Sequence, residues 1–242
     1  MTKAHKLFLK WLSQISLITF FLFLAYDQGL VTKILSSDKS YITSVILILF
    51  VLVSFHCAYF TYLVSDELNK AHIIKKSLLQ ENVKLKIIQN NLILTSKGEV
   101  SEGIVCDYFK DLIGLKKNGV STHVQILDSY LKKTVGYYEF GWFCSDVMLK
   151  LGLIGTVIGF IIMLSSLSDI TTFDVTLLQG VLTTMGSGMG VALYTTLSAL
   201  VTGVLIAIQY YNLESGCEEL FAVLNQISEA VSYTHLRAHE TS

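Results

Sequence analysis

Two apolar stretches decide the fold, LGLIGTVIGFIIMLSSL at residues 151–167 and GMGVALYTTLSALVTGVLIAI at residues 188–208. A helix needs about 20 residues to cross a hydrocarbon core about 30 Å thick, and both stretches come close to that length. Both carry hydroxyl side chains near the middle, Thr156 in the first and Thr195 and Thr196 in the second. The pair predicts two membrane-crossing helices with polar groups at depth.

The composition of the whole chain agrees with a membrane location. Of 242 residues, 52% are hydrophobic and 15% are charged, and the mean hydropathy is +0.57. Soluble domains usually carry about 25% charged residues. The net charge of −1 and the lack of an aromatic-studded basic stripe argue against nucleic-acid binding. The four cysteines lie far apart without a nearby histidine pair, so we expect no metal site and no cofactor.

Two further apolar runs precede the first pair, which gives four predicted crossings. They cover residues 7–26, 41–63, 148–167 and 186–210. The first run follows three lysines, as a signal peptide would. Its length and the lack of a small-x-small cleavage pattern favour a retained anchor.

The lysines predict the orientation of these crossings. The N-terminal tail carries Lys3, Lys6 and Lys10, and the long segment between the second and third runs carries eleven lysines. The first short loop has two lysines offset by two aspartates, and the second, at residues 168–187, has Asp169 and Asp174 and no basic residue. The positive-inside rule therefore predicts that both termini and the long middle segment are cytoplasmic.

The chain is predicted to divide into five parts. They are an N-terminal transmembrane pair at 1–63, a cytoplasmic helical domain at 64–140, a channel-forming transmembrane pair at 141–212, a cytoplasmic C-terminal helix at 213–231, and a tail at 232–242. In the middle domain, apolar periodicity predicts helices at 65–96 and 101–115 and a third from Ser121 into the third crossing. The tail resembles translated cloning or adapter sequence and is left out of the fold reasoning.

The third and fourth crossings contain the candidate site. Gly152, Gly155 and Gly159 share one face and predict close helix packing. Polar groups at membrane depth usually face protein or a water-filled cavity, so the hydroxyls predict an ion pathway of Thr156, Thr195, Thr196, Ser198 and Thr202. Asp146 and Lys150, four residues apart, are predicted to pair at the cytoplasmic edge.

A proton path also needs a group that titrates, and neither core helix contains an aspartate or glutamate at its centre. His56, in the second run, is the only deep titratable side chain. A single histidine at that depth is more often a packed residue than a relay. If the chain conducts protons, the storing carboxylate therefore belongs to a partner.

Two segments of this region resemble the MotA/TolQ/ExbB proton-channel family. Residues 151–159, LGLIGTVIG, are similar to the family pattern LGLLGTVxG, and residues 192–200, ALYTTLSAL, are similar to the start of its second helix. Two departures lie in the second segment: Ala199 stands where the family has glycine, and the proline expected near Leu205 is absent.

The resemblance implies an all-α membrane protein of the bacterial inner membrane, and four crossings resemble the MotA-like branch. It implies a homopentamer around a dimer of a single-helix partner of the MotB, ExbD or TolR type, whose aspartate binds H⁺ or Na⁺. It further implies that threonines matching Thr156 and Thr196 line the pentamer interior, and that ion flow drives mechanical work.

Two other functions remain open at this point. In a structural or signalling scaffold, the same threonines would only join helices, and the cytoplasmic helices would recruit partners. A secondary transporter is less favoured, because interrupted helices and internal repeats are absent from the sequence. No catalytic motif favours an enzyme.

Overall fold

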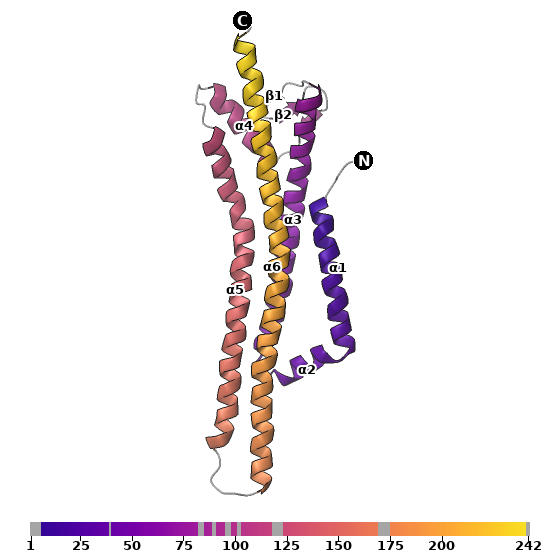
Figure 1. Ribbon diagram of the computed structural model, residues 1–242, viewed down its shortest axis with the longest axis vertical. Coiled ribbons are helices and arrows are strands. Elements are labelled where there is room, and N and C mark those ends of the chain that lie inside the picture. Colours follow the sequence, from indigo (N-terminus) through magenta and orange to yellow (C-terminus); the bar gives the residue numbers. More distant parts are fainter. Residues whose placement is uncertain are drawn as a thin grey trace. The chain divides into compact units, whose positions relative to one another are not determined.

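The computed structural model describes residues 6–38, 40–81, 85–88, 91–94, 98–100, 103–117, 123–168 and 175–240. Figure 1 shows the elements in chain order. The helices are α1 (Lys6–Asp27), α2 (Leu30–Ser37), α3 (Ile42–Glu81), α4 (Ile104–Lys117), α5 (His123–Ser168) and α6 (Val175–Glu240). The strands are β1 (Leu85–Ile88), β2 (Asn91–Leu94) and β3 (Gly98–Val100).

Four helices are long and apolar enough to cross a membrane. The candidate spans are Lys6–Asp27 in α1, Ile42–Ser77 in α3, Gln125–Ser165 in α5 and Gln179–Glu229 in α6. Each covers all or nearly all of one of the four apolar runs found in the sequence, so the prediction of an all-α membrane fold with four crossings is confirmed. The protein is a multi-pass membrane protein.

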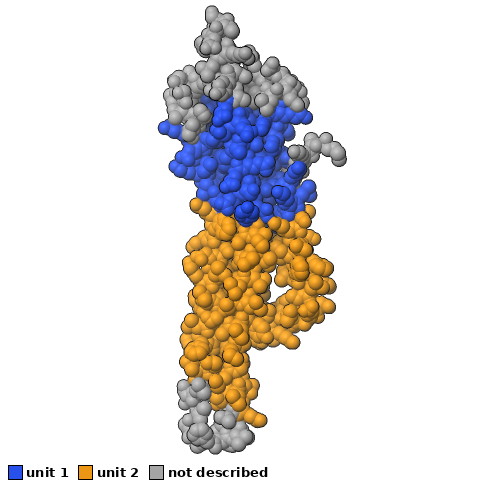
Figure 2. Space-filling view, in the orientation of Figure 1, with its two compact units in different colours: residues 1–11, 58–138, 211–242 blue, residues 12–57, 139–210 orange. Residues whose placement is uncertain are grey.

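The chain forms two compact units, which Figure 2 distinguishes by colour. Unit 1 comprises Met1–Trp11, Ala58–Tyr138 and Tyr211–Ser242, and unit 2 comprises Leu12–Cys57 and Glu139–Tyr210. The helices α1, α3, α5 and α6 each contribute residues to both units. Each unit is described below by itself.

Unit 1 has a hydrophobic core built from α3, α4 and α6. Its buried residues are Leu68, Ala71, Ile74, Val105, Cys106, Tyr108, Phe109, Leu112, Leu220, Phe221, Val223, Leu224 and Ile227. Ile126, Leu127 and Tyr130 of α5 pack against this core. The predicted helix at 101–115 is confirmed as α4, and the predicted helix from Ser121 into the third crossing is confirmed as α5.

A buried carboxylate fixes the start of α4 in unit 1. The backbone N–H of Val105, in the first turn of α4, donates a 2.8 Å hydrogen bond to Oε2 of Glu67 on α3. Lys70 donates to Oε1 of the same carboxylate at 2.9 Å. Gly103 leaves room for this group, since a Cβ there would lie 2.1 Å from Glu67 Oε1. A negative group at a helix N-terminus satisfies a free N–H and complements the helix dipole.

The predicted helix at 65–96 is confirmed up to Glu81 and is wrong at residues 85–88 and 91–94, which form strands. Residues 85–100 contain an antiparallel sheet in the order β1-β2-β3, with Leu85 paired to Leu94 and Leu92 paired to Val100. The segment contains the β-branched residues Ile87, Ile88 and Ile93, which favour strands. Leucine and isoleucine fit both the 3.6-residue repeat of a helix and the two-residue repeat of a strand. The apolar pattern of α3 therefore continues into the strand residues.

In unit 2, the first short loop is itself partly helical. Gly29, in the left-handed conformation with φ of 70°, precedes α2, which lies at a steep angle to α1 (Figure 1). Asp38 then caps α3: its carboxylate accepts hydrogen bonds from the backbone N–H of Ser40 at 3.0 Å and of Thr43 at 2.7 Å. The turn into α3 is therefore held by one buried side chain.

The second short loop is smaller than predicted, and α6 is longer at both ends. The sequence predicted a loop at 168–187, but α6 begins at Val175. The hydroxyls of Thr183 and Thr184 donate to the carbonyls of Gln179 and Gly180, one turn earlier in α6. These bonds satisfy both hydroxyl groups inside a helix, so the threonines are compatible with helix here. At its other end α6 continues to Glu240, past the break in the apolar stripe at Ser232. The non-native origin of residues 232–242 remains a prediction.

Replacing Glu67 by alanine should destabilise unit 1. The substitution removes the acceptor for Val105 and leaves a buried N–H unsatisfied, which costs about 1.5–3 kcal/mol for a bond to a charged group. Denaturant unfolding of the detergent-solubilised protein, followed by circular dichroism, measures the change. Asp66→Ala is the matched control, because Asp66 pairs with the same Lys70 at 3.0 Å but its side chain is 45% exposed, so its loss should cost about 0–1 kcal/mol. Equal losses in the two variants would contradict the capping role.

The Asp38 cap should be lost only in strong acid. Burial alone would raise the pKa of the Asp38 carboxyl, but hydrogen bonds from Ser40 and Thr43 outweigh burial and hold the pKa below 3.8. A lowered folded-state pKa stabilises the fold above the unfolded value, and this contribution disappears as the pH falls through the folded pKa. The Thr43 amide resonance should therefore titrate with a midpoint below 3.8 and should not titrate in Asp38→Asn. A midpoint at or above 3.8 in the unaltered protein would refute this.

Candidate functional site: the α5–α6 hairpin

Three glycines of α5 lie directly against α6 within unit 2. A Cβ on Gly152 would lie 2.5 Å from the Cβ of Ala199, and one on Gly155 would lie 2.3 Å from Oγ1 of Thr195. A Cβ on Gly159 would meet backbone atoms, at 2.6 Å from the nitrogen of Ala192. Real Cβ contacts are longer than these, so any larger residue forces the helices apart. The glycines are packing residues of the hairpin.

At Gly159 the close contact is reciprocal. A Cβ on Gly188 of α6 would lie 2.8 Å from the carbonyl oxygen of Gly159 and 2.8 Å from the nitrogen of Met163. In lipid, where the hydrophobic effect does not drive helices together, such small-residue contacts supply much of the packing energy. The sequence did not single out Ala192 and Ala199 as packing partners. Their signal is the small-residue spacing Gly188, Ala192, Thr195, Ala199, which follows one face of a helix.

Two of the five candidate ion-pathway residues are buried inside the protomer. Thr195 has no exposed surface, and its hydroxyl donates to the Val191 carbonyl at 2.8 Å. Thr202 is 5% exposed, and its hydroxyl donates to the Ser198 carbonyl at 2.7 Å. Both hydroxyls thus bond their own helix and lie on the face of α6 that packs within unit 2.

Thr156, Thr196 and Ser198 are half-buried instead. The hydroxyl of Thr196 donates to the Ala192 carbonyl at 3.0 Å and to the Gly152 carbonyl of α5 at 3.2 Å, so it joins the two helices. The hydroxyl of Thr156 donates to the Leu153 carbonyl at 2.6 Å. Because Thr156 follows Gly152 by four residues, it lies one turn farther along the same face of α5. Thr156 is therefore expected on the same side of α5 as the carbonyl that Thr196 contacts.

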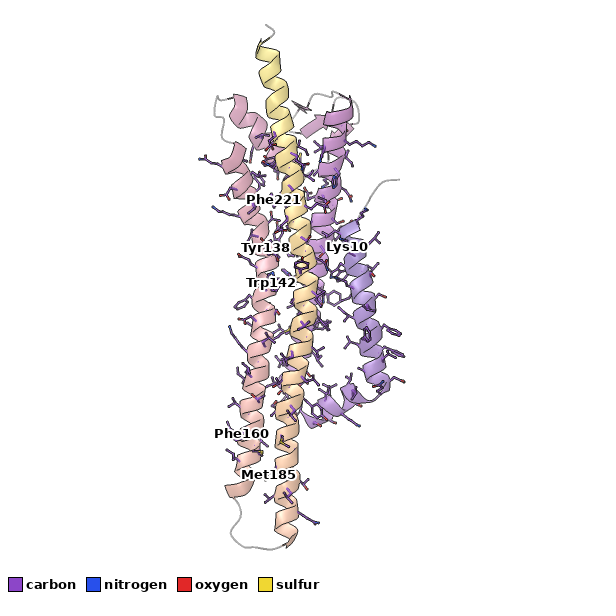
Figure 3. All side chains as sticks on the ribbon, in the orientation of Figure 1. Lys10, Tyr138, Trp142, Phe160, Met185 and Phe221 are labelled. Atoms are coloured by element: carbon purple, nitrogen blue, oxygen red, sulfur yellow. The ribbon has the colours of Figure 1, made fainter. Side chains whose placement is uncertain are left out.

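The outward face of α5 carries large exposed apolar side chains. Phe160, labelled in Figure 3, is 55% exposed, and Val157 and Ile161 beside it are exposed as well.

Asp146 and Lys150 form an exposed ion pair through Oδ2 and Nζ. An exposed pair of this kind contributes little to stability. A further polar link joins the helices nearby, where Ser145 donates to the Gly203 carbonyl at 3.0 Å.

The apolar parts of α5 and α6 contain hydroxyl and carbonyl oxygen atoms but no carboxylate. The sequence has no aspartate or glutamate at 147–168 or at 175–213. Among the residues that the structure describes, no group of three or more histidine, cysteine, aspartate or glutamate side chains could hold a metal ion. The chemistry available at Thr156 and Thr196 is hydrogen bonding to water or to an ion's ligand.

Gly159→Ala should weaken the hairpin. The added methyl group would meet the backbone of α6, which cannot move aside as a side chain can, and overpacking of this kind costs about 1–3 kcal/mol. Gly186→Ala on α6 is the matched control, because nothing lies within 4 Å of its added Cβ and alanine favours helix more than glycine does. The thermal unfolding midpoint in detergent should fall for the first variant and stay or rise for the second. A midpoint that is unchanged in both would show that the contact is not tight.

One part of the chain is similar to a known protein family. The model of the MotA/TolQ/ExbB proton channel family matches residues 145–226, which include the whole glycine contact and both half-buried threonines. No curated protein and no solved structure matches the chain. Over residues 145–226, about a third of its length, the chain is therefore similar to the MotA/TolQ/ExbB proton channel family.

Proposed function

We propose that the chain is the channel-forming subunit of an ion-driven motor that conducts H⁺ or Na⁺ together with a single-helix partner. The observation that carries the proposal is that Thr156 and Thr196 are half-buried hydroxyl residues on two helices that pack against each other, with Thr196 bonded to the Gly152 carbonyl of α5. The similarity of residues 145–226 to a proton channel family supports ion conduction in general. The partner and the motor role extend beyond that general function.

The need for a partner follows from the chemistry of hydroxyl groups. A threonine hydroxyl can orient water or bind an ion, but it does not release or store a proton near neutral pH. A carboxylate can do so, and the α5–α6 hairpin has none in its apolar part. In the proposal, a partner aspartate carries the ion, and Thr156 and Thr196 hold that carboxylate and its water. This chain itself performs no catalytic chemistry and needs no cofactor.

The proposed assembly is a homopentamer around a dimer of the MotB, ExbD or TolR type of partner. Large apolar side chains exposed on α5 and α6, such as Leu153, Phe160, Leu193 and Val204, provide surfaces for neighbouring copies and for lipid. The proposed location is the bacterial inner membrane. The lysine distribution supports an orientation with both termini in the cytoplasm.

Thr156→Val and Thr196→Val test the mechanism. Each change keeps the shape of the side chain and removes its hydroxyl, so each should lower ion flux by about tenfold or more, as expected for a lost hydrogen bond to a charged group. Flux is measured with a pH- or Na⁺-sensitive dye in vesicles that contain the chain and the single-helix, carboxylate-bearing protein encoded beside it.

Thr19→Val is the matched control for this experiment. Thr19 lies on α1, is exposed, and bonds the Ile15 carbonyl of its own helix as other membrane threonines do. Its replacement should leave flux unchanged. Unchanged flux in all three variants would favour the scaffold function, in which the threonines only join helices.

A further inference from the structure

His56 and Tyr210 form a hydrogen-bonded pair between α3 and α6 in unit 2. The imidazole Nδ1 lies 2.8 Å from the phenol oxygen, although the two residues are 154 positions apart in the chain. Tyr210 has no exposed surface and His56 is half-buried. The channel function proposed above makes no use of this pair.

Neighbouring groups hold the Tyr210 ring in place. A Cβ on Gly141 of α5 would lie 2.1 Å from Cδ1 of the ring, so the ring lies directly on the α5 backbone. Phe140 packs on the other partner, with its ring centroid 4.7 Å from that of His56. Next to the pair, the Gln209 side-chain amide donates to Ser54 Oγ at 3.2 Å. Three helices therefore meet at this point.

The phenol hydroxyl has two possible acceptors and a single proton. Its oxygen lies 2.8 Å from His56 Nδ1 and 3.3 Å from the carbonyl oxygen of Val53, also on α3. With a neutral imidazole that is unprotonated at Nδ1, the hydroxyl donates to Nδ1. When Nδ1 gains a proton, it must donate to the phenol oxygen, and the hydroxyl must turn to Val53. An O–H···O bond prefers about 2.7–2.8 Å, so Tyr210 would have to move toward α3.

We propose that His56 is a proton-binding site whose protonation reverses its hydrogen bond with Tyr210 and thereby changes the packing of α3 against α6. The geometry supplies a hydrogen-bond partner for both protonation states, which a packed histidine does not require. Among the described residues, the titratable groups that act on Tyr210 are the buried thiols of Cys57 on α3 and Cys144 on α5. Ordinary thiols are uncharged between pH 5 and 8, where imidazole titrates. The proposal does not depend on ion conduction.

Hydrogen exchange of the full-length chain in lipid nanodiscs tests the proposal at pH 5.5 and pH 7.5. After correction for intrinsic rates, peptides that contain residues 50–58 of α3 and 204–214 of α6 should change protection between the two pH values. The expected change is about fivefold, the size that accompanies the gain or loss of one hydrogen bond. His56→Gln should abolish the difference, because glutamine does not titrate.

His72→Gln and Tyr210→Phe complete the experiment. His72 also lies on α3, but its side chain is 46% exposed and its Nε2 lies 3.6 Å from Oε1 of the exposed Glu219. Its replacement should therefore leave the pH difference intact. Tyr210→Phe keeps the ring against Gly141 and removes only the hydroxyl, so it should abolish the difference without unfolding the chain. The ¹⁵N resonances of the His56 side chain in the unaltered protein should show protonation over the same pH range.

Two results would overturn the proposal. One is a pH difference in His56→Gln or Tyr210→Phe as large as in the unaltered protein. The other is a His56 side chain whose ¹⁵N resonances do not change between pH 5.5 and pH 7.5. Neither measurement involves ion flux, so failure here leaves the proposed channel function untouched, and failure of the threonine experiment leaves the His56 site untouched.

Discussion

Close backbone contact between α5 and α6 is the constraint on which the membrane hairpin depends. Lipid tails are as apolar as leucine, so two helices in a bilayer gain little from hiding apolar side chains against one another. They associate where their backbones approach closely enough for dense van der Waals contact. Gly159 and Gly188 allow that approach, because each lies against main-chain atoms of the opposite helix. The rotation of each helix about its own axis is thereby fixed.

That fixed rotation separates the hydroxyl groups into two kinds. Thr195 faces the contact with Gly155 and satisfies its hydroxyl within α6, so it belongs to the packing. Thr196, the next residue, is turned by about 100° and reaches the Gly152 carbonyl from the surface. Thr196 and Thr156 are the half-buried residues proposed for the ion pathway. In that proposal, adjacent threonines of α6 have different roles, one in packing and one in the pathway.

The sequence predicted the membrane helices well and their mutual contacts poorly. Apolar length alone locates the four crossings, because a bilayer demands a fixed length of helix. The strands at 85–94 were missed because leucine and isoleucine suit both periods, and the start of α6 was missed because its glycines and threonines are also typical of loops. Which of Thr195 and Thr196 is buried depends on helix rotation, and the pairing of His56 with Tyr210 joins residues 154 positions apart. Neither can be predicted from local pattern.

The glycine contact also determines where this protein can vary. Positions such as Gly155 and Gly159 admit no side chain at all, whereas Leu153, Val157 and Phe160 on the outward side of α5 touch little else within the chain. Substitutions on the outward side leave the hairpin intact and alter only what it meets in the membrane. A change in what α5 meets in the membrane therefore requires no change in the contact that sets the spacing of α5 and α6.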